Sequence, residues 1–155
     1  MRTAIFPGSF DPFTKGHEAI VEQALRLFDK VIIAIGENIS KRSLLTIEAR
    51  KQLICDLYKD EPRIECMTYS TLTIELARSL QAVAIVRGVR NTIDFEYERT
   101  MAQTNHRIQA DIETILLLTP PSLADVSSST VRELLKFGYD VKEMMPEGIE
   151  IKKYM

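Results

Sequence analysis

Four short stretches of the chain carry residue types that bind phosphate, and each comes after a run of apolar residues. The first is Gly8-Ser9-Phe10-Asp11-Pro12-Phe13-Thr14-Lys15-Gly16-His17. Its glycines allow close backbone approach, Ser9 offers a hydroxyl donor, and His17 offers an imidazole N–H. A helix opening at Gly16 would add free backbone N–H groups and a positive dipole end, which favour an anion and disfavour protonation of His17. The same residues also fit a plain connector with a capping or exposed histidine.

The second stretch, Arg87-Gly88-Val89-Arg90, places two arginines three residues apart around a glycine. Guanidinium groups match phosphate oxygens bidentately, and the glycine would let a ligand approach the backbone. The alternative is a solvated loop in which the arginines pair with Asp94 or Glu98. In that case the acidic residues complement the dipole of a following helix, and Phe95 and Tyr97 pack in the core.

The other two stretches are Ser40-Lys41-Arg42-Ser43 and the serine run Val126-Ser127-Ser128-Ser129. A lysine in a polar loop is usually solvated, but its ammonium could neutralise charge that develops on a phosphate. The serine run precedes a helix and adds a further anion site at its N-terminus. The plainer interpretation is that Thr130-Val131-Arg132-Glu133 forms a capping box, and both interpretations can hold together.

Alternating apolar runs and helical periodicity predict one doubly wound α/β domain over residues 1–155, with a five-stranded parallel sheet and a helical C-terminal segment from about residue 128. We expect strands at 2–6, 30–36, 63–67, 82–86 and 113–118. Helices are expected at 16–28, 46–58, 71–80, 92–107 and 128–137, with a weaker helical pattern at 140–153. Ligands bind at the carboxyl ends of the strands in such sheets, so the four stretches should converge there.

Composition narrows the function classes. A net charge of −2 and a sequence pI near 5.8 give no electrostatic reason to expect nucleic acid as a partner. We find no apolar run long enough to cross a membrane and no leader pattern, which predicts a cytoplasmic protein. Cys55 and Cys66 lack metal-ligand spacing and are expected to be buried thiols. No nucleophile elbow, Ser/His/Asp arrangement or carboxylate cluster for a metal is evident.

Three of these motifs together resemble a known family. The run from Gly8 to His17 resembles the first signature of the nucleotidyltransferases whose motif is (H/T)xGH, with threonine in place of the first histidine. The segment from Arg87 to Glu98 is similar to the RGxRxxxDFEYE motif of phosphopantetheine adenylyltransferases, and Val126–Arg132 is similar to their ISSSxVR motif. Phe6 stands where many members have tyrosine, and Leu123-Ala124-Asp125 differs from their aromatic-rich form.

The resemblance implies transfer of an adenylyl group from ATP to 4′-phosphopantetheine, with Mg²⁺ as the counter-ion of ATP. It implies a catalytic role for His17 and Lys41, and Lys41 is preferred to Arg42 on this ground alone. It assigns ATP contacts to Ser9, Phe10, His17, Gly88, Val89, Arg90, Glu98, Leu123, Ala124, Asp125, Val126, Ser127, Ser128 and Ser129. It assigns the acceptor to Ser9, Lys41, Thr73 and Arg87. A homohexamer and inhibition by coenzyme A are also implied.

Two other functions stay open from the sequence. One is nucleotidyl transfer to another phosphate acceptor, such as nicotinate mononucleotide, or transfer from CTP. The other is a nucleotide sensor without catalysis, which the intact His17 and Lys41 argue against. Tyr97, Met101 and Asn105 lie four apart on one helix face, which is typical of core packing, although in the family this helix borders the pantetheine pocket. His106 has no metal-binding partner one turn away and is expected at the surface or in a groove.

Overall fold

The computed structural model describes residues 1–37 and 42–155 of the chain. A single sheet of five parallel strands forms its centre, in the order β3-β2-β1-β4-β5. The strands are β1 (Thr3–Gly8), β2 (Lys30–Gly36), β3 (Ile64–Tyr69), β4 (Ala84–Val89) and β5 (Glu113–Leu118). The apolar runs become strands because the inner strands are covered on both faces, as in parallel sheets generally. The predicted doubly wound sheet is confirmed.

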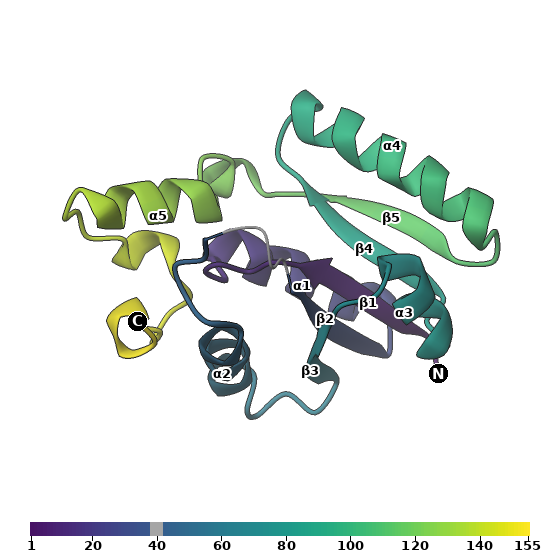
Figure 1. Cartoon of the computed structure of the whole chain (residues 1–155), viewed down its shortest axis with the longest axis horizontal. Coiled ribbons are helices and arrows are strands. Elements are labelled where there is room, and N and C mark those ends of the chain that lie inside the picture. The colour runs from purple at the N-terminus through teal and green to yellow at the C-terminus, as the bar shows by residue number, and fades with distance from the viewer. Residues whose placement is uncertain (38–41) are drawn as a thin grey trace.

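Helices cover both faces of the sheet. On one face, residues of α1 (Lys15–Leu27), α2 (Ile47–Leu57) and α5 (Ser128–Lys136) share a core with β1 and β2. On the other face, α3 (Thr73–Ser79) packs on β1 and β4, and α4 (Thr92–Ile108) lies along β4 and β5, as Figure 1 shows. The C-terminal end of the chain returns beside α2, where the Tyr154 hydroxyl donates to Asp56 at 2.7 Å.

The position of β1 defines where a ligand is expected. β1 lies at the middle of the sheet, with Ala4 opposite Val31 of β2 on one side and Ala84 of β4 on the other. The chain therefore passes to one side of β1 in its first half and to the other side in its second half. In doubly wound sheets a crevice opens at this switch point, at the carboxyl ends of the strands.

Several element boundaries differ from the prediction. β4 continues to Val89, so the first arginine and glycine of its motif are strand residues rather than loop residues. The start of α5 is capped by Ser127, whose hydroxyl accepts from the backbone N–H of Thr130 at 3.1 Å, so the predicted capping box from Thr130 is wrong. The weak helical pattern at 140–153 becomes two short 3₁₀ turns, Lys142–Met144 and Ile151–Lys153.

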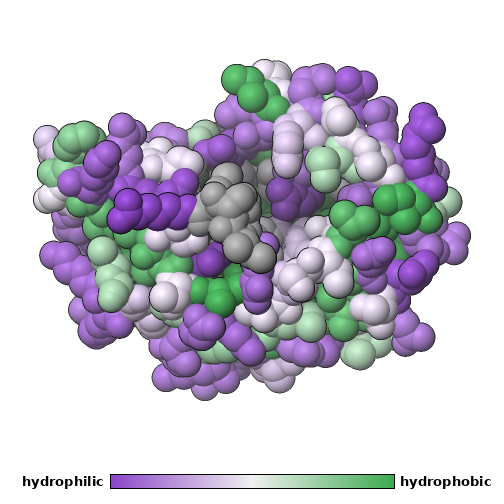
Figure 2. All heavy atoms as spheres, viewed as in Figure 1, coloured by the Kyte–Doolittle hydropathy of each residue, from purple (hydrophilic) through white to green (hydrophobic). Residues whose placement is uncertain are grey.

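Some side chains expected in the core are exposed. Cys55 is exposed and Cys66 is half-buried, so the prediction of two buried thiols is wrong. Burial raises the pKa of the Cys66 thiol to about 12. On α4, Phe95 is 44% and Tyr97 62% exposed, which rules out core packing for both. Figure 2 shows hydrophobic patches among hydrophilic residues on the face it presents. Within residues 1–37 and 42–155, none of the helices combines the length and the apolar character that a membrane crossing requires.

Candidate functional site

A pocket of about 360 Å³ lies at the carboxyl ends of β1 and β4, against the first turns of α1 and α5. Its volume is in the range of small-molecule sites. Three of the four stretches singled out in the sequence converge on it. The predicted residues that line it are Ser9, Phe10, His17, Arg87, Gly88, Arg90, Glu98, Val126, Ser127, Ser128 and Ser129.

The geometry of His17 leaves one ring nitrogen for a ligand. Its Nδ1 accepts a hydrogen bond from the backbone N–H of Thr14 at 3.0 Å, and this contact also caps the start of α1. Since Nδ1 is the acceptor, the proton of the neutral ring sits on Nε2. The ring is held from several sides by Phe6, Phe10 and Phe13, with centroids 5.0 to 6.2 Å away. His17 therefore offers a fixed, neutral N–H donor.

The electrostatic setting keeps this imidazole uncharged. Burial, together with the nearby positive charges of Arg87 and Arg90, lowers the pKa of His17 to about 3, and burial is the largest of these causes. The sequence predicted a depressed pKa from the helix end, whereas burial and the two arginines are its causes here. A neutral donor suits an anion because it supplies a hydrogen bond without requiring a proton to be taken up.

Arg87 projects from β4 into the pocket and is held in place by α4. Its guanidinium donates to both carboxylate oxygens of Glu98, at 2.8 Å each, and also to the backbone carbonyl of Pro7 in β1. Glu98 is buried, so the bidentate pair fixes the orientation of the arginine. The ion pair that the sequence offered as an alternative to a phosphate role therefore exists, and it places Arg87 at the pocket rather than in a solvated loop.

Arg90 and Asp94 form the second ion pair of this motif, with Nε 3.0 Å from the carboxylate. Asn91 caps α4 by accepting from the backbone N–H of Asp94 at 2.9 Å, which sets the helix start beside the pocket. Gly88 has a packing role that the sequence did not reveal. A Cβ there would lie 2.9 Å from Cγ1 of Ile20 in α1, so the close approach of helix and strand requires glycine.

The serine run and α5 close the opposite side of the pocket. Ser128 donates to the carbonyl of Pro12 at 2.7 Å, which ties the start of α5 to the first loop. Arg132, one turn into α5, donates to the carbonyl of Asp11 at 2.8 Å and to the Ser129 hydroxyl at 3.2 Å. Arg132 lines the pocket although it was not among the predicted site residues. Its position three residues after Ser129 on a helix was the available signal.

Not every predicted residue lies at this pocket. The Val89 side chain is buried, and Leu123-Ala124-Asp125 lies outside the lining in and after a 3₁₀ turn (Pro121–Leu123). Leu123 instead lines a separate depression between α1 and the C-terminal segment. Lys41 falls outside the described residues, so its proposed role stays a prediction.

A smaller pocket of about 160 Å³ adjoins the first one and shares Pro7, Arg87 and Glu98 with it. The predicted acceptor residue Thr73 lines it, and its hydroxyl is 2.8 Å from that of Tyr69. The α4 stripe of Tyr97, Met101 and Asn105 lines the same pocket, so this stripe faces a cavity rather than the core. The two pockets therefore share a wall.

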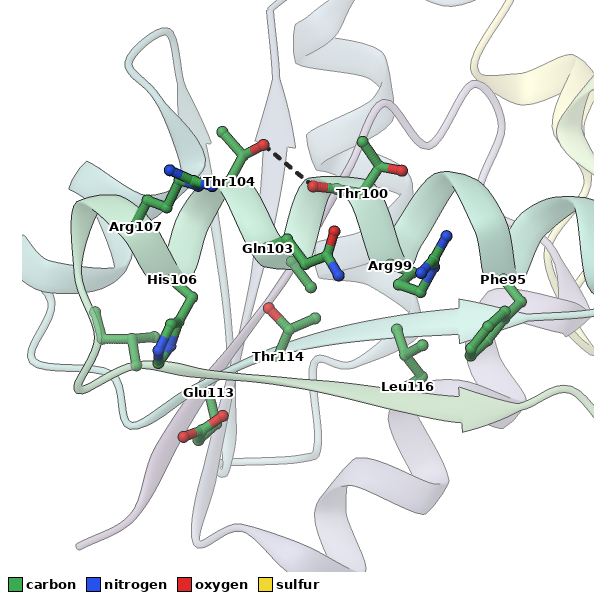
Figure 3. Close-up of a pocket in the computed structure, with 12 residues that line it drawn as sticks. Phe95, Arg99, Thr100, Gln103, Thr104, His106, Arg107, Glu113, Thr114 and Leu116 are labelled. Atoms are coloured by element: carbon green, nitrogen blue, oxygen red, sulfur yellow. Dashed lines mark hydrogen bonds between the residues drawn. The ribbon is translucent and has the colours of Figure 1, made fainter.

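A third hollow, of about 790 Å³, lies between α4 and β5 and contains none of the predicted site residues. Figure 3 shows Phe95, Gln103 and His106 extending from α4 toward Thr114 and Leu116 of β5. His106 is exposed there, which confirms the surface or groove position expected from the sequence.

Comparison with known proteins shows the family from the sequence. The family model described as "Cytidylyltransferase-like" matches residues 5–134. The phosphopantetheine adenylyltransferase of Bacteroides thetaiotaomicron is 53% identical over 97% of this chain and 99% of its own length. That of Flavobacterium johnsoniae is 46% identical over 99% of this chain and all of its own length.

Two solved structures share the fold. A bifunctional NMN adenylyltransferase/ADP ribose pyrophosphatase from Francisella tularensis aligns with a TM-score of 0.72 at 20% identity, over 93% of this chain and 44% of that one. A putative nicotinate-nucleotide adenylyltransferase from Vibrio parahaemolyticus aligns with a TM-score of 0.66 at 21% identity, over 94% of both chains. At this identity the likeness concerns the fold alone. With relatives of about half-identical sequence along nearly its whole length, the chain belongs to the phosphopantetheine adenylyltransferase family.

Proposed function

We propose that the chain transfers the adenylyl group of ATP to 4′-phosphopantetheine, giving dephospho-coenzyme A and pyrophosphate, and that His17 stabilises the transferring phosphorus centre. The observation that carries the second part is the fixed, neutral Nε2–H of His17 in a pocket that also presents Arg87 and Arg90. The names of the relatives support the choice of the two substrates.

The reaction needs no covalent enzyme intermediate. An oxygen of the acceptor phosphate attacks the α-phosphorus of ATP in line, a new P–O bond forms, and the bond from the α-phosphorus to the bridging oxygen breaks. Pyrophosphate leaves with that electron pair. Negative charge grows on the α-phosphoryl oxygens and on the leaving group, so correctly placed donors lower the barrier. The N–H of His17 is the donor best suited to the α-phosphoryl oxygens, and Lys41 is proposed as their cationic partner.

The two arginines divide the phosphates between them. Arg87 belongs to both pockets, so it is suited to hold the acceptor phosphate where the smaller pocket meets the larger one. Thr73 and the α4 stripe would then line the path of the pantetheine arm, and Ser9 would orient the attacking phosphate. Arg90 would hold the β- and γ-phosphates together with Ser127, Ser128 and Ser129, which line the same pocket.

The other expectations from the family are proposals of the same standing. Mg²⁺ would arrive bound to the phosphates of ATP. Coenzyme A would inhibit by occupying the acceptor side, and the enzyme would work in the cytoplasm. A homohexamer would cover exposed apolar surface of α4 such as Phe95, which is 44% exposed.

The test is a pyrophosphate-release assay with ATP, Mg²⁺ and 4′-phosphopantetheine, with the product identified by mass. Turnover that depends on both substrates is expected. Parallel reactions with nicotinate mononucleotide as acceptor and with CTP as donor serve as controls. A folded protein that makes no dephospho-coenzyme A, or that prefers one of the control substrates, would contradict the proposal.

A further inference from the structure

Two buried charged residues lie behind the phosphate pocket rather than in it. Asp11 and Arg50 are each only 6% exposed, and neither was assigned a role from the sequence. The described hydrogen bonds of both side chains go to backbone groups, and no ion pair between the two is found among the described residues. Charged side chains are rarely buried unless their contacts serve a purpose that offsets the cost of desolvation.

The contacts of these residues form a closed ring around the first loop. The Asp11 carboxylate accepts from the backbone N–H groups of Leu44 and Leu45, at 2.8 Å each. Leu45 leads directly into Thr46, which caps α2 by accepting from the N–H of Ala49 at 3.1 Å. One turn into α2, Arg50 donates from Nη1 to the carbonyl of Ser9 at 2.8 Å. Ser9 and Asp11 are two residues apart in the chain, which completes the ring.

Phe10, which lies between Ser9 and Asp11, has a backbone conformation that its surroundings must hold in place. Phe10 has a φ of 49°, in the left-handed region that residues other than glycine seldom adopt. The phenyl group of Phe10 is buried against Gly8, and a Cβ on Gly8 would lie 2.9 Å from the Cζ atom of Phe10. Such a conformation persists only where the surroundings impose it, and these conformations concentrate at functional sites. The ring from Asp11 to Arg50 fixes the backbone on either side of Phe10.

The ring also affects which backbone groups face the pocket. The C=O and N–H of one peptide point in opposite directions, because the peptide is planar and trans. Since the Ser9 carbonyl is bound by Arg50, the N–H of Phe10 points away from α2. Ser9 is exposed and lines the pocket together with Phe10. The position of the Ser9 hydroxyl and the Phe10 N–H thus depends on contacts made outside the pocket.

We infer that Asp11 and Arg50 are positioning residues for phosphoryl transfer: together they hold the Ser9–Phe10 peptide in the orientation that presents its donors to the reacting phosphates. This inference rests on the proposed function. The residues act through Ser9 and Phe10 and touch no substrate. Since Arg90 and the serine run bind the outer phosphates from other elements, loss of the ring should affect kcat more than the KM for ATP.

Asp11→Asn and Arg50→Met open the ring at different places. The asparagine amide places an NH₂ donor against a backbone N–H, so one of the two contacts is lost. Each variant is expected to lose about 10- to 100-fold in kcat, as small misplacements of reacting groups do, with the KM for ATP changed less than about threefold. Because either change opens the same ring, the double variant should be no worse than the more severe single variant. Arg50→Lys should recover part of the kcat that Arg50→Met loses.

Tyr154→Phe is the matched control, because it removes a hydrogen bond to Asp56 of α2 outside the ring and should leave kcat unchanged. All variants are compared at a temperature where circular dichroism shows them folded, and the Arg50 variants carry the test if Asp11→Asn does not fold. Wild-type kcat in either folded single variant, equal losses in the control, or a double variant whose loss is the product of the single losses would overturn the inference. A wild-type enzyme without turnover would defeat the proposed function and this inference with it, whereas active wild-type and active variants would defeat the inference alone.

Discussion

Replacing His17 with asparagine separates the two tasks of the imidazole. In the structure Nδ1 accepts from the Thr14 N–H, and Nε2 is the nitrogen left to donate into the pocket. The amide oxygen of asparagine can take the place of Nδ1, so the start of α1 stays capped. Its shorter side chain has no group at the place of Nε2. His17→Asn should therefore keep the fold and lose the donor.

The size of the effect follows from the kind of hydrogen bond that is lost. Removing one donor aimed at charge that develops in a transition state costs about 10²- to 10³-fold in kcat, or about 2.7–4 kcal/mol. The retained cap avoids the cost of an uncapped helix start, so the loss in the free energy of unfolding comes from the missing ring contacts with Phe6, Phe10 and Phe13 and should be about 1–3 kcal/mol. With its pKa near 3, His17 is neutral throughout the usual assay range, so the loss in kcat should be the same from pH 6 to 8.

The assay is steady-state pyrophosphate release over this pH range, together with urea denaturation of each variant. His17→Gln is the informative partner, because its amide NH₂ reaches toward the position of Nε2, and its amide oxygen can still accept from the Thr14 N–H as in a capping box. It should retain more activity than His17→Asn and be at least as stable. Wild-type kcat in His17→Asn would refute the donor role. An acid limb near pH 6.5 in the wild type that disappears in both variants would refute the neutral imidazole.

Three further predictions concern stability. The pKa of His17 is about 3 in the folded protein and about 6.5 in the unfolded chain, so the unfolded chain takes up the proton first as the pH falls. The stability present above pH 6.5 is therefore lost as the pH falls toward 3. By pH 5 the loss is about 2 kcal/mol in urea melts; an equal pH slope in His17→Asn would contradict this cause. Gly88→Ala places a Cβ 2.9 Å from Ile20 and should lower the free energy of unfolding by about 1–3 kcal/mol. An unchanged melting temperature would contradict this prediction. Ser127→Ala removes the cap of α5 and should cost about 1 kcal/mol in the same melts, while Ser127→Asn, another good cap, should cost little.

The sheet could be predicted from the sequence because its strands are short apolar runs that periodicity exposes directly. Residues of mixed character were harder to place. Arg87 and Gly88 interrupt the apolar run of β4, so the strand seemed to end at residue 86, although both residues continue its pairing with β5. Tyr97 and Met101 have the spacing of a core stripe, but that spacing does not reveal whether a helix face meets the core or a cavity.

The sequence likewise predicted some residues of the site and missed others. Motif spacing brought His17, the arginines and the serine run to one edge of the sheet. It could not reveal Asp11 or Arg50 as supports of the first loop, because their partners are backbone groups 33 to 41 residues away. A contact with a backbone group does not depend on the residue type of the partner, so the sequence pattern does not reveal it. The predicted cap of α5 was wrong for a related reason. Ser127 and Thr130 are both good caps, and the contacts of the serine run in the fold select Ser127.

The central place of β1 means that neither half of the chain contains a whole site. Ser9 and His17 come from the segment before β2, while Arg87, Arg90 and the serine run come from β4 and beyond. The turn at Gln81 between α3 and β4 separates the two sets. If the chain were expressed as two fragments divided there, each would carry only part of the phosphate contacts, and adenylyl transfer would report directly on whether β1 and β4 had re-paired. The fold therefore offers a natural dividing point for a complementation assay in which catalysis is the signal of reassembly.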